Sequence, residues 1–562
     1  MGSCFSRMKH CSLFSKHHNV ALNENQASSS HLFEHENNSS HSSIDFFLED
    51  IDECLNETEK IFLSVIDTIN LPPQLQRLIE IANTDHGWLK IINSMINVIG
   101  THAVKGLVEN DHIGPAVIIL LLEDSQLPTR ELIRDLLALL NPYFELRIHS
   151  PCDETIIKHR NICAILSFLA EKLAGSLSVN LLSMRIIKFL EKVIKEKHNH
   201  LHVLFALNCV EKFARTNENK QIILKNFDIV KELCELEKYV QYFSIQALYY
   251  SSSTELLKYQ LGFCAQWCLD NVFTKKGRKF SYKKVDYSNL NVILNVNDKT
   301  EFLKLSPDGL SVKSNEFYAR CDTYTFECVR SNYHVSSGIY FYEVILLTSG
   351  IMQIGWATKS TSFKNHEGSG VGDDAHSIAF DGCRRVIWHN MTNYEHNLPL
   401  WNAGDIVGCL IDFNKKRFIF YLNGKKVEIG RKISHKINLV FSDEPYYAAA
   451  SLMSYQHCHF NFGQAPFKYP PKKYKFKDFN SEAIITNKDD YKVIPMRVKI
   501  KACNKSFSFS SNKRNLCNIC CDKSANVRLK PCGHEGICSD CAIQMEQCPF
   551  CRETFVHFED LQ

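Results

Sequence analysis

The sequence lacks a long uninterrupted run of apolar residues. Its longest run is Ala116–Leu122, whereas a helix that crosses a bilayer needs about 20 apolar residues. The first residues, MGSCFSRMKHCSLFSKHHNV, also lack the apolar core of a secretory signal, since lysine, arginine and histidine occur throughout them. We therefore expect neither a membrane-spanning nor a secreted protein.

The sequence also lacks a strong net charge. The 562 residues carry a formal charge of +3, with 45% hydrophobic and 23% charged residues. These fractions are those of ordinary soluble globular proteins, and so small a net charge does not indicate a nucleic-acid or membrane surface. The length predicts three or four domains.

Cysteine, in contrast, is abundant near the end of the chain. Seven cysteines and one histidine form four close pairs, in the pattern Cys517-x2-Cys520-x11-Cys532-x-His534-x3-Cys538-x2-Cys541-x6-Cys548-x2-Cys551. Four such ligands complete a tetrahedral structural zinc site, so the pattern provides for two Zn²⁺ ions. A segment this short has little apolar core, and the metal must therefore supply most of its folding free energy.

A disulfide cluster is the alternative interpretation, but it requires an oxidising compartment. The remaining cysteines are scattered through apolar segments, as Cys163, Cys209 and Cys264 are, and single buried cysteines behave as small hydrophobes. This usage fits a reducing cytosol. Cys503 and Cys521 lie near the cluster but complete no ligand pair.

The spacing and the single histidine in fourth place resemble the RING finger of the C3HC4 type. RING fingers interleave their two sites. The resemblance implies one zinc on Cys517, Cys520, Cys538 and Cys541, and the other on Cys532, His534, Cys548 and Cys551. With all eight ligands used, no coordination position remains for a catalytic water, so both ions are expected to be structural.

RING fingers bind a ubiquitin-loaded E2 enzyme and promote transfer of ubiquitin to a lysine. The residues that match the usual E2-facing surface are Ile519, Met545, Pro549 and Arg552. The resemblance implies that Arg552, directly after the last ligand, contacts both E2 and ubiquitin. Packing over the zinc loops is the alternative for Ile519 and Pro549, and a solvated charge is the alternative for Arg552.

The module also resembles the compact RING fingers of apoptosis inhibitors, which dimerise through a short tail. Here residues 553–558, ETFVHF, alternate polar and apolar side chains as a short strand does. A RING homodimer is therefore one expectation.

The other end of the chain, residues 1–44, is predicted to be a disordered arm rich in Ser, Asn and His. Its start, MGSCFS, matches the pattern for N-myristoylation on Gly2. Stable anchoring needs a second signal, which palmitoylation of Cys4 could supply. We expect a cytoplasmic protein with membrane association through this lipidated end; chance occurrence of the motif is the alternative.

Residues 45–275 show apolar residues at helical spacing, as in 162–173, 182–194 and 201–213. The phrase FALNCVEKFA at 205–214 resembles an armadillo repeat, a fold that presents a long surface to partners. A generic helical bundle is the alternative. The region shows no nucleophile, phosphate loop or paired carboxylates in a catalytic arrangement.

Residues 290–470 switch to the alternation of β-strands. We expect strands at 338–345 and 352–357, paired as neighbours, and a hairpin over 416–427 with a type I′ turn at Asn423-Gly424. These phrases resemble the SPRY (B30.2) domain, a β-sandwich whose edge loops bind peptide segments of partner proteins. Candidate partner-binding residues are Arg384, Arg385, Trp388 and Tyr394, with a structural role as the alternative for each.

Residues 471–513 are expected to form a linker before the RING finger at 514–562. The linker begins with a basic stretch, PKKYKFK. Basic runs with aromatic residues can bind RNA, but this run is short and the chain is nearly neutral, so we expect a solvated linker and no nucleic-acid partner.

The order helical region, SPRY domain, C-terminal RING is similar to that of RING-type E3 ubiquitin ligases that carry a SPRY domain. The similarity covers residues 70–552 and is strongest in YQLGFCAQWCLDN (259–271), SGIMQIGWA (349–357) and LKPCGH (529–534). It implies an enzyme that brings an E2 to a protein substrate held by the SPRY and helical domains. The alternative is a scaffold whose RING only dimerises.

The amino-terminal motif yields a first prediction. Gly2→Ala should abolish incorporation of a clickable myristate analogue and release the protein from cellular membranes, because the acyl chain attaches only to an amino-terminal glycine. Cys4→Ser should keep the myristate label but weaken membrane retention. An acetylated amino-terminal methionine on the wild-type protein would refute this prediction.

Overall fold

The structure is a computed structural model of the chain. It describes residues 50–58, 60, 73–100, 113–147, 154–173, 175–197, 199–241, 245–285, 290–306, 317–322, 325–364, 368–394, 398–430, 441–484, 492–495, 498, 517–518, 524–543, 545, 548–549 and 555–561. The chain divides into two compact units, Met1–Val493 and Ile494–Gln562.

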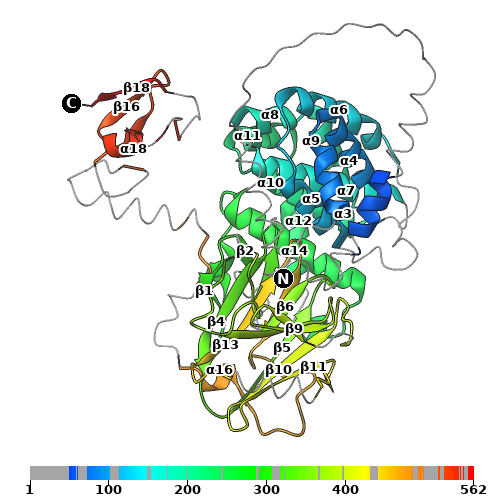
Figure 1. Ribbon diagram of the computed structural model, residues 1–562, viewed down its shortest axis with the longest axis vertical. Helices are drawn as coiled ribbons and strands as arrows, with labels where there is room; N and C mark the ends of the chain where they lie inside the picture. The colour runs from blue at the N-terminus through cyan, green and yellow to red at the C-terminus, as the bar shows by residue number, and fades with distance from the viewer. Residues whose placement is uncertain are drawn as a thin grey trace, which may run out of the picture. The chain divides into compact units, whose positions relative to one another are not determined.

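The first unit begins with a helical region (Figure 1). Its helices are α3 (Pro73–Ala82), α4 (Asp85–Val98), α5 (Ile113–Asp124), α6 (Arg130–Phe144), α7 (Glu154–Lys172), α8 (Gly175–Leu181), α9 (Met184–Glu196), α10 (His200–Phe213), α11 (Asn217–Asn226), α12 (Ile229–Gln241), α13 (Ile245–Leu248) and α14 (Ser253–Asn271). The three segments predicted from apolar periodicity are α7, α9 and α10. Helical structure in this region is therefore confirmed, while the armadillo arrangement stays a prediction.

Local sequence explains where these helices begin. The Ser183 hydroxyl caps α9 by accepting a hydrogen bond from the amide of Ile186. Helix α14 begins with a capping box, in which Ser252 and Glu255 satisfy each other's backbone amides. None of the helices among the described residues is both long enough and apolar enough to cross a bilayer.

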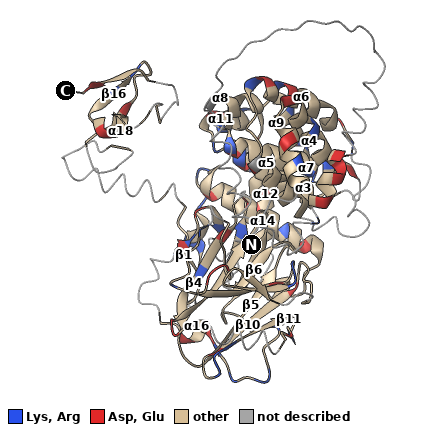
Figure 2. Ribbon diagram, in the orientation of Figure 1, with Lys and Arg blue, Asp and Glu red and all other residues tan. Residues whose placement is uncertain are grey.

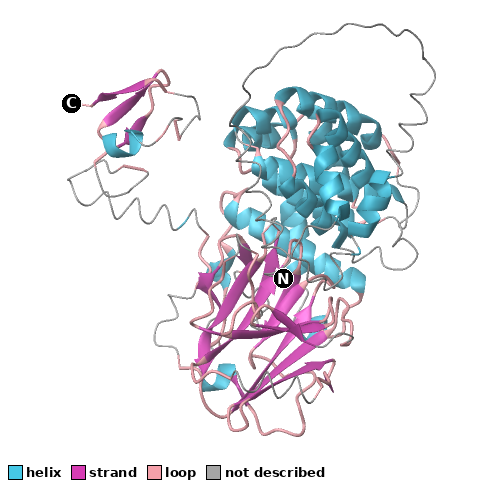
Figure 3. Cartoon of the chain, viewed as in Figure 1, coloured by secondary structure: helices cyan, strands magenta, loops and turns pink. Residues whose placement is uncertain are grey.

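The second half of this unit is a β-sandwich, and Figure 3 shows its strands gathered in one part of the unit and the long helices in another. One sheet has the order β1-β4-β13-β6-β7-β8-β9 and the other has β12-β11-β10-β5-β14-β3-β2. The strands are β1 (Leu294–Lys299), β2 (Leu303–Leu305), β3 (Phe317–Cys321), β4 (Glu327–Val335), β5 (Ile339–Leu346), β6 (Met352–Thr358), β7 (Ser377–Asp381), β8 (Val386–His389), β9 (Thr392–Tyr394), β10 (Ile406–Asp412), β11 (Arg417–Leu422), β12 (Lys425–Lys426), β13 (Tyr446–Leu452) and β14 (His457–Asn461).

The predicted strands exist, but one predicted pairing is wrong. Strand β5 pairs with β10 and β14, whereas β6 pairs with β13 and β7 in the other sheet. The segment between them therefore crosses from one sheet to the other, and every residue of β6 is buried. The hairpin prediction is confirmed, since β11 pairs with β12 and the turn residues Asn423 and Gly424 have φ values of 49° and 76°.

The sandwich extends into residues that the sequence analysis assigned to the linker. Strand β15 (Lys477–Asp478) pairs with β5, and helix α16 (Phe479–Glu482) follows it. Phe479 is fully buried among the core aromatics, with Trp356 at 5.8 Å between ring centroids. Residues 467–476 cover the outer face of the larger sheet, where Tyr474 and Phe476 pack against a second apolar cluster.

A buried cluster of charged residues joins the helical region to the sandwich. Lys304 on β2 places its Nζ 2.5 Å from a Glu211 carboxylate oxygen on α10 and 3.1 Å from Asp322. Arg320 on β3 binds the same Asp322 carboxylate at 2.7 Å and donates to the Gln260 side chain of α14 at 2.9 Å. Figure 2 shows both signs of charge on the helices as well as on the sandwich, but this cluster differs because its side chains are at most 5% exposed.

Burial and neighbouring charges act in opposite directions on these carboxylates. Desolvation alone would raise the pKa of Asp322, but the charges of Arg320 and Lys304 outweigh it and lower that pKa. The pKa of Glu211 is lowered for the same reason, by Lys304, Lys212 and Arg215. Both carboxylates are therefore charged at neutral pH, and the cluster is a set of compensated buried ions.

This cluster yields a second prediction. Asp322→Asn should lower the free energy of unfolding of the first unit by about 3 kcal/mol or more, because it leaves buried cations without their counter-charge. Urea unfolding followed by tryptophan fluorescence measures it. All five tryptophans, at positions 88, 267, 356, 388 and 401, lie in this unit.

A pH series sharpens the test. A carboxylate with a lowered pKa stabilises the fold above its unfolded pKa of about 4 and loses that contribution as the pH falls further. The wild type should therefore lose stability below about pH 4 more steeply than Asp322→Asn does. Glu482→Gln, which removes the exposed pair with Lys477, should change stability by less than about 0.5 kcal/mol; an equal effect of the two variants would contradict the prediction.

Candidate metal centre

The second unit is a small three-stranded sheet with one short helix. The strands are β16 (Val527–Lys530), β17 (Glu535–Ile537) and β18 (His557–Asp560), in the order β17-β16-β18, and the helix is α18 (Ser539–Ile543). Its apolar core is small: Val527, Leu529, Ile537 and Ala542 are buried beside cysteine side chains. Burial of so few apolar groups does not stabilise an isolated fold. This unit therefore needs a further source of stability, such as bonds to a metal ion.

The structure brings the predicted zinc ligands together in two groups. The ligand atoms within each group lie within 4.8 Å of one another; the groups are Cys517, Cys538 and Cys541, and Cys532, His534 and Cys548. Residues that alternate along the chain thus share a site, as the interleaved arrangement implies. Cys520 and Cys551, the fourth members predicted for the two sites, lie outside the described residues.

The donors in these groups fit zinc. Thiolate sulfur and imidazole nitrogen are the ligands of structural zinc sites, and no carboxylate takes part in either group. The elements explain the geometry: the β16–β17 hairpin positions Cys532 and His534, and the start of α18 positions Cys538 and Cys541. Cys517 and Cys548 are buried in the same core.

The predicted E2-facing residues are only partly described. Pro549 is exposed next to Cys548, and Met545 is half-buried against the apolar core. Ile519 and Arg552 lie outside the described residues. Ile543, which the sequence analysis did not name, is 71% exposed at the end of α18. An exposed apolar residue two positions after a predicted zinc ligand is a candidate for the same surface, but α18 is too short for an apolar period to reveal it.

The tail strand forms within the chain. Strand β18 pairs with β16 through His557–Asp560, a later span than the 553–558 expected, and Phe558 packs on the core. The tail therefore stabilises the RING of its own chain, and dimerisation stays a prediction. Gly2 and Cys4, the predicted lipidation sites, lie outside the described residues.

The four candidate residues of the sandwich do not form one exposed site. Arg384 is ion-paired with Asp381 at 2.6 Å and stacks over Trp388, and these two side chains are 7% and 3% exposed. Both side chains are buried, and Trp388 shares a sheet face with its cross-strand partner Ala379, opposite to the core residue Ile387. This burial favours the structural alternative for them. Arg385 is exposed but donates from Nε to the Leu398 carbonyl at 2.6 Å, and Tyr394 is half-buried on β9.

Two family models match the chain. The SPRY domain model matches residues 339–465. The model for the zinc finger of C3HC4 type, the RING finger, matches residues 513–558. The chain therefore contains a SPRY domain and a zinc-binding RING finger, as expected from the sequence.

Curated relatives match parts of the chain. The chain is 41% identical over 145 residues to the E3 ubiquitin-protein ligase RKP of Arabidopsis thaliana, a match that covers 26% of this chain and 11% of that one. It is 29% identical over 182 residues to the ATP-dependent RNA helicase DDX1 of Xenopus laevis, which covers 32% of this chain and 22% of that one. The chain thus spans only a small part of the length of these relatives.

Solved structures include the SPRY domain of human HERC1, at 12% identity and a TM-score of 0.23, which covers 31% of this chain and 99% of that one. Together, the two family matches and the similarity to the plant ligase support a protein of the RING and SPRY type.

The two ligand groups yield a third prediction. The purified full-length protein should contain two zinc ions by native mass spectrometry, and His534→Ala should contain fewer, because the eight predicted ligands supply two closed tetrahedral sites. Chelation should unfold the second unit and leave the tryptophan fluorescence unchanged, because residues 494–562 contain no tryptophan. A folded RING free of zinc would contradict the prediction.

Proposed function

We propose that this protein is a RING-type E3 ubiquitin ligase, which binds a ubiquitin-loaded E2 through residues 514–562. The observation that carries the proposal is the pair of interleaved Cys/His groups on a unit that the RING model matches. The similarity to the plant E3 ubiquitin-protein ligase supports the same activity.

The proposed mechanism needs no covalent intermediate on this chain. When bound, zinc holds the loops of the RING in place and contributes no open coordination position. The exposed side chains of Ile543 and Pro549, with Ile519 and Met545, would provide an apolar contact for the E2. Arg552 would donate hydrogen bonds to both E2 and ubiquitin and so restrict the conjugate to a reactive orientation.

Substrate recruitment is assigned to the first unit. The sandwich and the helical region share one apolar core and the buried ion cluster, so they would act as a single rigid receptor. Holding a target protein near the charged E2 raises the effective concentration of its lysines. This contribution, with orientation by Arg552, is the whole of the proposed catalysis.

A fourth prediction tests the activity directly. With E1, ATP and a panel of E2 enzymes, the wild type should autoubiquitinate with at least one E2. Arg552→Ala should keep its zinc and its E2 binding but slow ubiquitin discharge on the order of tenfold, equivalent to about 1.4 kcal/mol of transition-state stabilisation. Single-turnover discharge of the E2 conjugate to free lysine measures this step.

Two controls separate the possible failures. Arg528→Ala removes another exposed arginine of the same unit, paired with Glu535, and should leave discharge unchanged. His534→Ala should abolish activity through loss of a zinc ligand. A folded, zinc-loaded wild type that is inert with every E2 would refute the ligase and favour the scaffold whose RING only dimerises.

A further inference from the structure

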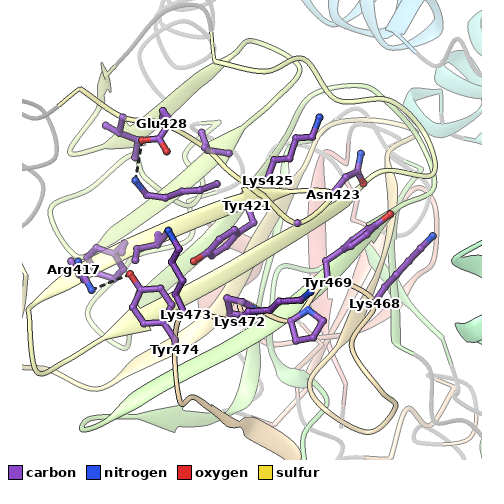
Figure 4. A pocket seen from close by; sticks show the side chains of 18 residues that line it. Arg417, Tyr421, Asn423, Lys425, Glu428, Lys468, Tyr469, Lys472, Lys473 and Tyr474 are labelled. Carbon is purple, nitrogen blue, oxygen red and sulfur yellow. Dashed lines mark hydrogen bonds and ion pairs between the residues drawn. The ribbon is translucent and has the colours of Figure 1, made fainter.

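A basic groove runs along one edge of the sandwich, far in the sequence from the predicted binding loops. It is a cavity of about 840 Å³, lined by the β11–β12 hairpin and by residues 468–474. Figure 4 shows side chains from both segments gathered around the same space. Ligand sites typically occupy cavities of about 300–1,000 Å³, so the groove is large enough to take a segment of a peptide.

The groove is built by the segment that covers the outer face of the larger sheet. Ile419 and Tyr421 of β11 point outward and form, with Phe341 and Leu410, the apolar cluster on which Tyr474 packs. The hairpin turn packs closely on Tyr469 because residue 424 is glycine: a Cβ at this position would lie 3.1 Å from Tyr469. The two walls are therefore held by packing.

Six cationic side chains line this groove, and Glu428 is the single carboxylate among its lining residues. Three of the cations already have partners. Arg417 binds Asp412 at 3.1 Å, Lys426 binds Glu428 at 3.0 Å, and Lys468 donates to the Tyr249 carbonyl. These three side chains are therefore already engaged within the protein.

The other three cations are Lys425, Lys472 and Lys473. Each is exposed, and none makes a hydrogen bond or ion pair with the part of the chain that the structure describes. Two come from one wall and one comes from the other, so they present positive charge to the groove from both sides. Such a set is complementary to a ligand that carries several negative charges along its length.

The aromatic residues of the groove distinguish between two classes of anionic ligand. Binding of single-stranded nucleic acid relies on bases stacked on open aromatic rings. Here Tyr421 is only 8% exposed, and cations already lie near the faces of two others: Arg417 is 5.4 Å from the ring of Tyr474, and Lys468 is 5.5 Å from that of Tyr469. The half-buried rings suit the apolar stems of a peptide better than they suit bases.

We propose that this groove binds an acidic linear segment of a protein, with its carboxylates on Lys425, Lys472 and Lys473 and its apolar atoms against Tyr469 and Pro470. The inference deepens the proposed function and rests on it, since it assigns acidic segments as the substrate class that the SPRY domain recruits. Recognition of acidic motifs by clustered cations is an established mode of peptide binding.

The test uses the full-length protein and a short fluorescein-labelled peptide of alternating glutamate and serine. Fluorescence anisotropy should show binding that weakens with added salt, and the counterpart with glutamine in place of glutamate should not bind. The triple variant Lys425→Glu, Lys472→Glu, Lys473→Glu should bind at least about tenfold more weakly, because three favourable charge pairs become repulsive.

The matched control is Lys275→Glu, Lys276→Glu, Lys279→Glu. It reverses three exposed lysines that do not line the groove and should bind the peptide within about twofold of the wild type. No binding by the wild type, or equal weakening in both triple variants, would overturn the proposal. Groove-dependent binding of a single-stranded RNA in place of the peptide would overturn it in favour of a nucleic acid.

An autoubiquitination assay distinguishes failure of the groove proposal from failure of the ligase proposal. The groove variant leaves the RING unchanged, so it should autoubiquitinate as the wild type does while losing modification of a reporter protein that carries the acidic peptide. An inert wild type would refute the ligase, and the anisotropy measurements would still decide on the groove. Retained modification of the reporter by the groove variant would refute the assigned substrate class.

Discussion

The structure of the first unit depends on a small set of buried charges. Lys304 and Arg320 of the sandwich meet Glu211 and Asp322 where helices α10 and α14 cover it. Burying an ion costs free energy unless an opposite charge lies beside it. The helices must therefore pack on the strands in the one arrangement that pairs these charges. We infer that the cluster contributes to specificity of docking more than to net stability, and that it makes the helical region and the SPRY domain one body.

The second unit follows a different principle. Its apolar core is limited to a few side chains around β16 and α18, and the interleaved Cys/His groups replace the missing burial with metal–ligand bonds. The division suits the proposed function. A receptor stabilised by its own core can select a target, while a RING stabilised by zinc can present a surface to an E2.

Some features of the fold and of the candidate sites could be predicted because they are encoded locally. The spacing of Cys532 and His534, the apolar period of α7, α9 and α10, and the Asn423-Gly424 turn each depend on residues close together in the chain. The pairing of β5 and β6 could not be predicted this way. Both strands are buried almost throughout, including the polar residues Glu343 and Gln353, and alternation does not reveal which sheet such a strand joins.

The sequence by itself determined which modules are present: a helical region, a SPRY domain and a RING finger. Only the tertiary structure decided which polar side chains face solvent. Arg384 and Trp388 have the composition of a binding loop but lie buried beside Asp381, while the basic stretch after residue 470 forms one wall of a groove. The physical reason is that burial depends on contacts between segments distant in sequence, such as β11 and residues 467–476, and local patterns do not contain that information.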